Sequence, residues 1–284
     1  MRRDRLMAGT RLGEIDFEWL IANLEVGTLP YGVDEEQVGN IDTFVLGPKA
    51  VHAAETYVLG LFQLYPTVYF HKATRSAEKI FTELLFSIIS LVRDGSISST
   101  PENHPLVRLA KEPDNIKCVL QLDDAVVWGA LSMMAEAKDR AIASFSMCLR
   151  DRRLFKCFDV RAQLIQGLGE AKADEAIVEK ACTSIVDRVE EWTKRDNNRA
   201  RILIDRATRE PYKRFQESKG PLNQIMIRAV DGKLVDLGER SKIVKAIDPF
   251  RLCRIYLADN DNEAKNFAQE AIKTEVIDAA RLHA

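Results

Sequence analysis

Histidine is scarce in this sequence, and the usual patterns of catalytic side chains are absent. The four histidines stand far apart, and none is followed by aspartate; they are His52, His71, His104 and His283. A metal-dependent hydrolase needs several histidine and carboxylate ligands that converge on one ion. No P-loop, dinucleotide fingerprint or nucleophile elbow occurs either. We therefore assign no catalytic residue, no metal ligand and no cofactor to this chain.

Cysteines are also few and scattered. The chain has five, with no C-x-x-C pair, at Cys118, Cys148, Cys157, Cys182 and Cys253. An odd number at wide spacing indicates neither a disulfide framework nor a zinc knuckle. We expect reduced thiols that are buried as small apolar side chains.

Long hydrophobic runs and an excess of one charge are missing too. The longest apolar run, around Leu84 to Val92, is far too short to span a bilayer, and no secretory signature is present. The 43 acidic and 41 basic residues leave a net charge of −2, which gives no global field for nucleic acid. We expect a cytoplasmic protein that binds neither membrane nor nucleic acid, although a local cationic pocket for phosphates is compatible with this charge.

The first two-thirds of the chain show helical periodicity. Asp16 is a plausible N-cap for the first helix, Pro66 should kink a long helix or mark a junction, and Asp94-Gly95 is an ordinary helix end. The predicted helices cover residues 17–26, 51–71, 76–92, 106–111, 124–135 and 138–149, and a loop at 27–39 leads to a short hairpin at 41–46.

After Arg150 the pattern changes to short apolar segments separated by helices. Asp231-Gly232 between two of these segments is a strong hairpin signal. The predicted strands cover 154–158, 200–204, 225–229, 233–235 and 251–257, and the helices 174–194, 241–246 and 263–277. We therefore predict a mainly α fold with a C-terminal α+β unit, a small and mostly antiparallel sheet covered by helices. The predicted division is 1–95, 96–150 and 151–284.

Several short motifs follow one another in a consistent order. They are Arg3-Asp4 with Gly9, Gly13 and Asp16-Phe17; Ala54-Glu55, Leu64-Tyr65 and Val68-Tyr69-Phe70-His71-Lys72; Leu122-Asp123-Asp124; Arg152-Arg153-Leu154-Phe155-Lys156; and Pro249-Phe250-Arg251 with Arg254-Ile255-Tyr256. In this order they resemble the C-terminal portion of HD-superfamily phosphohydrolases of the dNTP triphosphohydrolase type. Residues 1–95 are then the helical substrate-side region, 96–150 a helical connection and 151–284 the α+β unit.

The resemblance implies a role for four residues in binding substrate. It places Asp4 on the sugar of a deoxynucleotide, where a carboxylate can accept a hydroxyl hydrogen bond. It places Tyr69 against that sugar, with His71 and Lys72 close by to face phosphate or a subunit neighbour. Simpler alternatives are a partner or capping role for Asp4, a core role for Tyr69, and a solvated helix end at His71 and Lys72.

Two departures from the family pattern bear on activity. Leu61 stands where related enzymes carry a phosphate-binding arginine, so a bidentate phosphate donor is lost. The metal-binding His, His-Asp and Asp of the family have no counterpart here, and we expect them upstream of Met1. The divalent metal is thus implied only for the full-length family.

We expect this chain to be the C-terminal part of an HD-type phosphohydrolase that is inactive by itself. The alternative is a non-catalytic oligomerisation or protein-interaction module derived from that family. Because a missing front would expose apolar surface, we expect a homo-oligomer. Other charged runs have simpler explanations: Asp123-Asp124 and Asp259 to Asn262 as helix caps, and the basic residues from Arg150 to Lys156 as a charged face.

Overall fold

In the computed structural model, segments far apart in the sequence fold together into two units. The structure describes residues 2–9, 14–33, 36–96, 100–170, 173–195, 201–213 and 224–281. Unit 1 combines Met1–His71 with Thr208–Arg251, and unit 2 combines Lys72–Ala207 with Leu252–Ala284. The borders predicted from the sequence, after residues 95 and 150, differ from the borders of these two units. Local sequence patterns do not show which distant segments pack together. The roles assigned to its three parts stay predictions.

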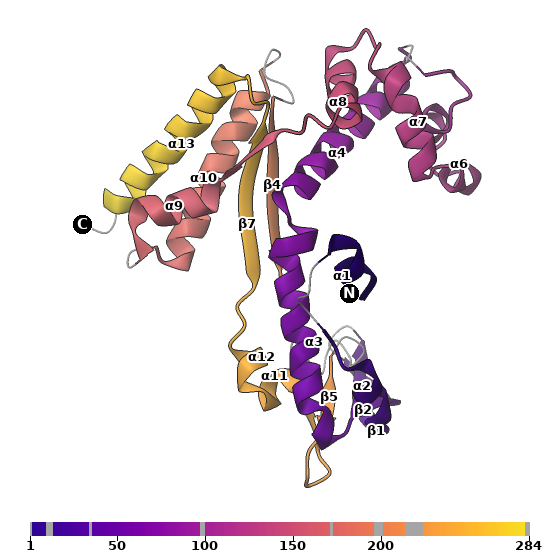
Figure 1. Ribbon diagram of the computed structural model, residues 1–284, viewed down its shortest axis with the longest axis vertical. Coiled ribbons are helices and arrows are strands. Elements are labelled where there is room, and N and C mark those ends of the chain that lie inside the picture. The colour runs from indigo at the N-terminus through magenta and orange to yellow at the C-terminus, as the bar shows by residue number, and fades with distance from the viewer. Residues whose placement is uncertain are drawn as a thin grey trace. The chain divides into compact units, whose positions relative to one another are not determined.

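Unit 1 contains a sheet, one long helix and several short helical turns (Figure 1). Its elements are α1 (Arg2–Ala8), α2 (Phe17–Ala22), β1 (Leu24–Val33), β2 (Glu36–Leu46), the 3-10 turn η1 (Pro48–Ala50), α3 (Val51–Leu64), the π-helical turn η2 (Tyr65–Tyr69), β5 (Met226–Arg228), β6 (Leu234–Asp236), α11 (Leu237–Arg240) and α12 (Lys242–Lys245).

The hairpin of β1 and β2 corrects two predictions. The helix expected over 17–26 ends at Ala22, and the loop and short hairpin expected over 27–46 are one long antiparallel pair. The helix does begin as predicted, since the Asp16 side chain accepts a hydrogen bond from the Trp19 amide. The apolar spacing that suggested a longer helix is too short to distinguish helix from strand. The one proline and two glycines of β1 are tolerated because β1 is an edge strand.

Gly27 has a packing reason to be glycine. A β-carbon at this position would lie 2.8 Å from side-chain atoms of both Leu234 and Val45. The hairpin β5–β6 therefore packs directly on the backbone of β1. A small core of Leu29, Val45 and Met226 lies in the same contact.

The sheet of unit 1 has the order β1-β2-β5-β6, so it joins the N-terminal hairpin to residues near 230. The predicted hairpin at Asp231-Gly232 is confirmed, with Gly232 at φ +84°. The prediction that these two strands belong to the sheet of the C-terminal α+β unit is wrong, because they extend the sheet of β1 and β2. Ile227 of β5 pairs with Leu46 of β2 in a parallel arrangement. The local sequence around Leu46 does not predict a partner at this distance along the chain.

The core of unit 1 lies between α3 and this sheet. Its buried residues come from the sheet, η1, α3, α11 and α12: Leu46, Ala50, Ala54, Val58, Ile227, Leu237 and Val244. Glu55 adds a polar link, because its carboxylate accepts a hydrogen bond of 2.6 Å from the Ser241 hydroxyl at the start of α12.

Unit 2 is built mainly of helices around a three-stranded sheet. Its elements are α4 (Lys72–Arg93), α5 (Pro105–Lys111), α6 (Ile116–Leu120), α7 (Asp124–Met134), α8 (Arg140–Arg150), β3 (Lys156–Asp159), α9 (Val160–Leu168), α10 (Glu175–Thr193), β4 (Ile202–Arg209), β7 (Phe250–Leu257) and α13 (Asn262–Arg281); β4 and β7 extend into unit 1. The predicted elements of this region are confirmed within a few residues, while α6 and α9 were not predicted. The mainly α fold with a C-terminal α+β part is confirmed.

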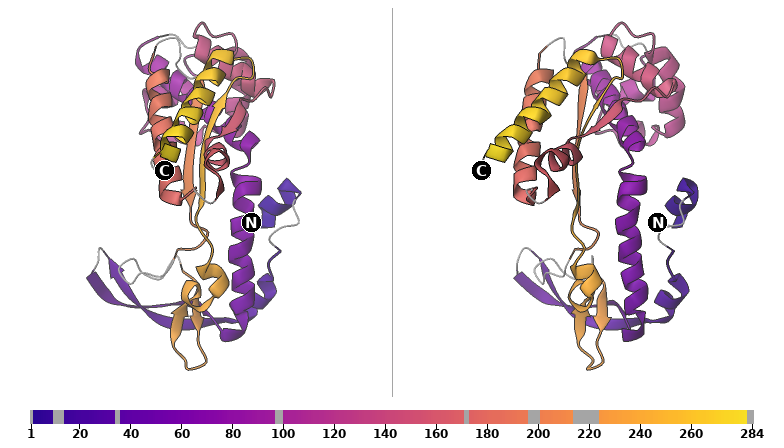
Figure 2. Two further views of the ribbon diagram at one scale, coloured as in Figure 1. Left: turned by 90° about the vertical axis from the view of Figure 1, so that its left-hand side faces the viewer. Right: turned by 60° about the vertical axis from the view of Figure 1, so that its left-hand side comes forward.

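Helix packing covers both faces of the sheet β3-β7-β4. Successive residues of β7 point to opposite faces, so that Ile255 and Leu257 contact the core under α9, α10 and α13, whereas Tyr256 joins the core under α4, α5, α7 and α8. Figure 2 shows α10 and α13 side by side in both views. Helix α4 contributes the regular series Ile80, Leu84, Ile88 and Val92 to the second core.

A buried ion pair connects α4 to the sheet. Asp205 of β4 is fully buried, and the Arg75 guanidinium donates to both of its carboxylate oxygens. Lys79, one turn further along α4, has its ammonium 3.6 Å from the same carboxylate. The pair satisfies a charge that would otherwise be costly to bury.

The five cysteines are free thiols, as expected; three are buried, whereas Cys148 and Cys157 are half-buried. Within the described residues, no helix is both long enough and apolar enough to cross a bilayer.

The buried ion pair yields a stability prediction. Asp205→Ala should lower the free energy of unfolding by about 3 kcal/mol, because it removes the buried carboxylate that Arg75 and Lys79 share. Asp151→Ala is the matched control: its partners Arg150 and Arg153 lie at the surface, and the loss should be much smaller than for Asp205→Ala. Urea unfolding followed by circular dichroism measures both, and equal losses would refute the structural role given to Asp205.

Candidate functional site

The structure brings together two of the residues predicted to bind substrate. The Tyr69 hydroxyl donates a hydrogen bond of 2.6 Å to the Asp4 carboxylate, across 65 positions of sequence. Asp4 lies in the first turn of α1, and Tyr69 is the last residue of η2. Both side chains are half-buried, so the pair lies at the surface of unit 1 and is partly accessible to solvent.

A local break in the helix positions Tyr69. Pro66 has no backbone N–H, so it cannot donate the bond that would continue α3 beyond Leu64. The chain widens into a π-helical turn, in which the Phe70 amide donates to the Tyr65 carbonyl at 2.7 Å. The predicted junction at Pro66 is thereby confirmed. Such single π turns often occur at functional positions.

The hydrogen bond shifts the pKa of both partners. The Asp4 carboxylate raises the pKa of Tyr69 from 10.0 to about 12, and the Tyr69 hydroxyl lowers the pKa of Asp4 below 3.8. The bond needs a neutral phenol and an ionised carboxylate. Its contribution is therefore fully present between about pH 4 and pH 10. It is lost as the pH falls through the lowered pKa of Asp4, and as the pH rises through about 12.

Aromatic rings form a wall behind this pair. The Tyr65 ring lies 6.1 Å from the Tyr69 ring and 6.3 Å from that of Phe250, and the Phe70 ring stacks on Phe250 at 5.2 Å. Burial raises the pKa of the Tyr65 hydroxyl, while the positive charge of Arg209 acts in the opposite direction. Sequence reasoning found Phe250 only as part of the motif Pro249-Phe250-Arg251 and gave no role to Arg209.

The other predicted residues follow Tyr69 directly. His71 comes after η2 and Lys72 begins α4, with both side chains exposed. Leu61 is half-buried in α3, two turns before Tyr69. The roles of His71 and Lys72 in binding substrate stay predictions.

The described residues do not offer a metal centre. No group of three or more His, Cys, Asp or Glu side chains among them is arranged around one point. His52 uses its Nδ1 for the Glu55 carboxylate at 2.9 Å, and Glu55 also accepts from Ser241. This donor set does not fit a divalent ion, so no chemical step is assigned to a metal held by these residues.

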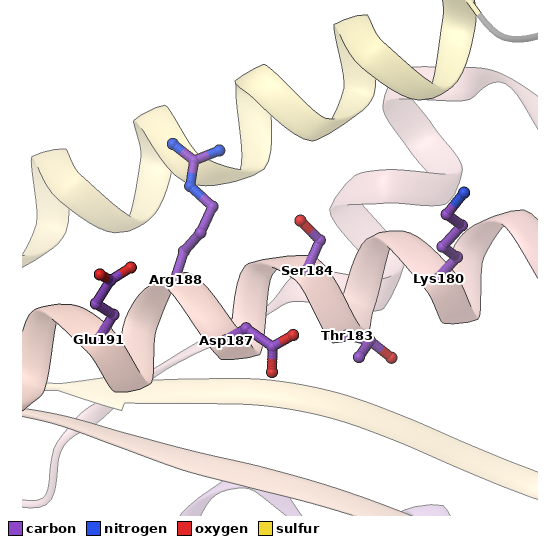
Figure 3. A pocket seen from close by; sticks show the side chains of 6 residues that line it. All are labelled: Lys180, Thr183, Ser184, Asp187, Arg188 and Glu191. Carbon is purple, nitrogen blue, oxygen red and sulfur yellow. The ribbon is translucent and has the colours of Figure 1, made fainter.

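One hollow of unit 2 lies apart from these residues. It measures about 450 Å³, is wide open, and is lined by residues of α10: Lys180, Thr183, Ser184, Asp187, Arg188 and Glu191 (Figure 3). Ser184 donates to Glu275 of α13 at 2.6 Å, so the hollow follows a contact between two helices. None of the residues predicted to bind substrate lines it.

A second, apolar hollow of about 250 Å³ is lined by α4, α5 and α7 together with Asp123 and Asp124. The Asp123 carboxylate accepts from the Val126 amide, so the predicted N-cap of α7 is confirmed. In the same way Asp261 caps α13 through the Ala264 amide.

Part of the chain is similar in sequence to known proteins. Residues 36–100 match the family described as HD associated region. The chain is 23% identical to the uncharacterized protein YwfO of Bacillus subtilis over 156 residues. This match covers 55% of this chain and 33% of YwfO.

Two solved structures share the fold. A phosphohydrolase from Bacteroides thetaiotaomicron matches with a TM-score of 0.60 at 18% identity, over 90% of this chain and 59% of its own. A hypothetical protein from Aquifex aeolicus matches with a TM-score of 0.52 at 19% identity, over 97% of this chain and 55% of its own. The chain thus spans between one-third and three-fifths of the length of these proteins.

The family match covers residues 36–100, and the fold of the chain is similar to that of the Bacteroides phosphohydrolase. The matched region, 36–100, contains Tyr69, His71 and Lys72. Asp4 lies outside it, and the hydrogen bond to Tyr69 is what connects Asp4 to the matched region.

The Asp4–Tyr69 bond can be tested by titrating tyrosine absorbance in the near ultraviolet. The difference between the native chain and Tyr69→Phe should show one hydroxyl with a pKa of about 12. Asp4→Ala should return this value toward 10.0, because the negative charge and the acceptor are both removed. Asp16→Ala, which removes only a helix cap, should leave it unchanged. A Tyr69 pKa that is already ordinary in the native chain would contradict the bond.

Proposed function

We propose that this chain forms the sugar side of a deoxynucleotide pocket in an HD-type phosphohydrolase of the dNTP triphosphohydrolase type. The observation that carries the proposal is the Asp4–Tyr69 hydrogen bond. It joins the two residues that the family resemblance assigns to the sugar, and no feature of the local sequence requires them to meet.

The chemistry of the pair suits a sugar hydroxyl. A carboxylate has about four lone-pair sites, so Asp4 can accept a sugar hydroxyl in addition to the Tyr69 hydroxyl. Because the pKa of Asp4 is lowered, the carboxylate is ionised at neutral pH and stays an acceptor. The Tyr69 hydroxyl, held by Asp4, orients its ring at a fixed angle.

The ring of Tyr69 supplies the proposed preference for deoxyribose. A rigid aromatic face lets an unsubstituted carbon pack closely, whereas an added hydroxyl there would lose its hydration without a partner. The wall of Tyr65, Phe70 and Phe250 restricts movement of that face. His71 and Lys72 are positioned in sequence to meet the phosphates.

Hydrolysis requires groups that these residues do not supply. A divalent metal in this family polarises the phosphate and provides the attacking hydroxide. The described part of this chain has no donor set for it. We therefore propose that the chain alone binds substrate without converting it.

The second candidate is a non-catalytic assembly module. The presence of Leu61 at the expected position of a phosphate-binding arginine favours it. On this interpretation the fold shared with the family serves contacts between protein chains, and the chain binds no nucleotide.

Calorimetry with a dNTP separates the two candidates. We expect binding to the native chain and an affinity about tenfold lower for Asp4→Ala, since the charged acceptor of the sugar hydroxyl is lost. Tyr69→Phe should weaken binding as well, and the matching ribonucleotide should bind less tightly than the dNTP. Asp139→Ala, which removes the cap of α8 in unit 2, is the control and should bind as the native chain does. Absence of binding for every nucleotide would favour the assembly module.

Turnover is a separate test. The purified chain with manganese or nickel and a dNTP should release no phosphate product above the buffer rate, as measured by chromatography. Product release that a chelator abolishes would overturn the proposed inactivity and would reveal a metal site that this donor set does not account for.

A further inference from the structure

The ends of two neighbouring strands bring an arginine to the aromatic wall of the candidate site. β4 and β7 are neighbours in one sheet and run side by side (Figure 1). Arg209 is the last residue of β4, and Phe250 is the first residue of β7. Both residues belong to unit 1, so they lie at the same end of the strand pair.

The alternation of side chains places Arg209 and Phe250 on the same face of these strands. Leu203 of β4 and Tyr256 of β7 both belong to the core under α4. Successive side chains of a strand point to opposite faces, so the odd-numbered residues of β4 share this face with the even-numbered residues of β7. Asp205, which is paired with α4, follows the same rule. The Arg209 side chain therefore lies on the face that carries the Phe250 ring.

The positive charge of Arg209 acts on the aromatic wall. The Phe250 ring lies 6.3 Å from the ring of Tyr65. Burial raises the pKa of the Tyr65 hydroxyl, and the charge of Arg209 lowers it, which agrees with the position that the strands give to Arg209. The Tyr65 ring is also 6.1 Å from the ring of Tyr69, whose hydroxyl is bound to Asp4. Arg209 and Asp4 thus lie on either side of Tyr65 in this series of contacts.

Most of the hydrogen-bond donors of Arg209 are available to a ligand. The side chain is exposed, and its Nη1 donates to the Thr208 carbonyl at 3.1 Å. Among the residues that the structure describes, no carboxylate forms an ion pair with Arg209. A guanidinium has five N–H donors in a planar fork, which matches the oxygens of a phosphate group.

We propose that Arg209 binds the phosphate groups of a nucleotide whose sugar lies against Asp4 and Tyr69. This inference rests on the proposed function and adds to it a cation for the phosphates. The Tyr65 amide donates to the Leu61 carbonyl, so positions 61 and 65 are one turn apart and face the same side of α3. The apolar side chain at position 61 offers no donor there, and Arg209 supplies one from β4.

Opposite charges then determine the direction in which the nucleotide binds. The Asp4 carboxylate accepts the sugar hydroxyl and repels the phosphates, whereas the Arg209 guanidinium attracts the phosphates. The ring of Tyr65 adjoins both ends of the wall and separates the two charges. A nucleotide that carries phosphates is therefore preferred over the corresponding nucleoside.

Calorimetry with inorganic tripolyphosphate, which has no sugar, tests the role of Arg209 separately from the sugar site. Arg209→Ala should lower the affinity for tripolyphosphate and for a dNTP about tenfold, because a charge-assisted hydrogen bond is lost. Asp4→Ala should weaken binding of the dNTP without weakening that of tripolyphosphate. Arg240→Ala is the control: Arg240 is exposed at the end of α11 in the same unit, and its replacement should change neither affinity.

The two proposals fail in different ways. A native chain that does not bind tripolyphosphate, or an Arg209→Ala variant that binds it like the native chain, would overturn the role of Arg209. Weakening of tripolyphosphate binding by Arg209→Ala, together with a dNTP affinity that Asp4→Ala leaves unchanged, would support the role of Arg209 and overturn the sugar site.

Moving the positive charge to α3 provides a second test. The double variant Leu61→Arg with Arg209→Ala places a guanidinium on the same side of Tyr65 and should regain most of the native affinity for tripolyphosphate. Arg209→Lys keeps the charge without the planar fork and should bind with intermediate affinity. A double variant as weak as Arg209→Ala alone would refute the position assigned to the phosphates. Circular dichroism of each variant establishes that the fold is retained.

Discussion

The candidate site depends on the backbone hydrogen bond that Pro66 cannot make. A continuous α-helix over 51–71 would turn Tyr69 by a different angle from the one that η2 gives it. The wider turn places the Tyr69 hydroxyl on Asp4 and packs the rings of Tyr65 and Phe70 against Phe250. One missing N–H thus determines how the longest helix of unit 1 meets both the N-terminal helix and a strand near residue 250.

The sequence predicted those features that local chemistry decides. Pro66 indicated the junction after α3, Asp123 the start of α7, and Asp231-Gly232 a tight turn. In each case the residue type strongly favours one local backbone structure. The Asp4–Tyr69 contact was anticipated only through the family resemblance. Nothing in the periodicity of either segment requires the two residues to meet.

The features that could not be predicted are those that distant packing decides. Leu24 to Val33 contains two glycines and a proline and has no clean alternation, yet it forms a strand because β2 pairs with it along its whole length. The parallel contact of Leu46 with Ile227 is likewise invisible locally. Among the site residues, the rings of Tyr65 and Phe250 are adjacent only because the chain returns to unit 1 after residue 207.

That return has a consequence for the order of folding during synthesis. The segment 208–251 is an insertion between β4 and β7, which belong to the same sheet of unit 2. Leu46 is synthesised 181 residues before its partner Ile227, as 227 minus 46 shows. At translation rates of about 5–20 residues per second, the hairpin β1–β2 waits roughly 10 to 40 seconds for the strands that cover its inner face. During that interval Leu29 and Val45 lack Met226 and Leu234, the side chains against which they pack in the folded protein.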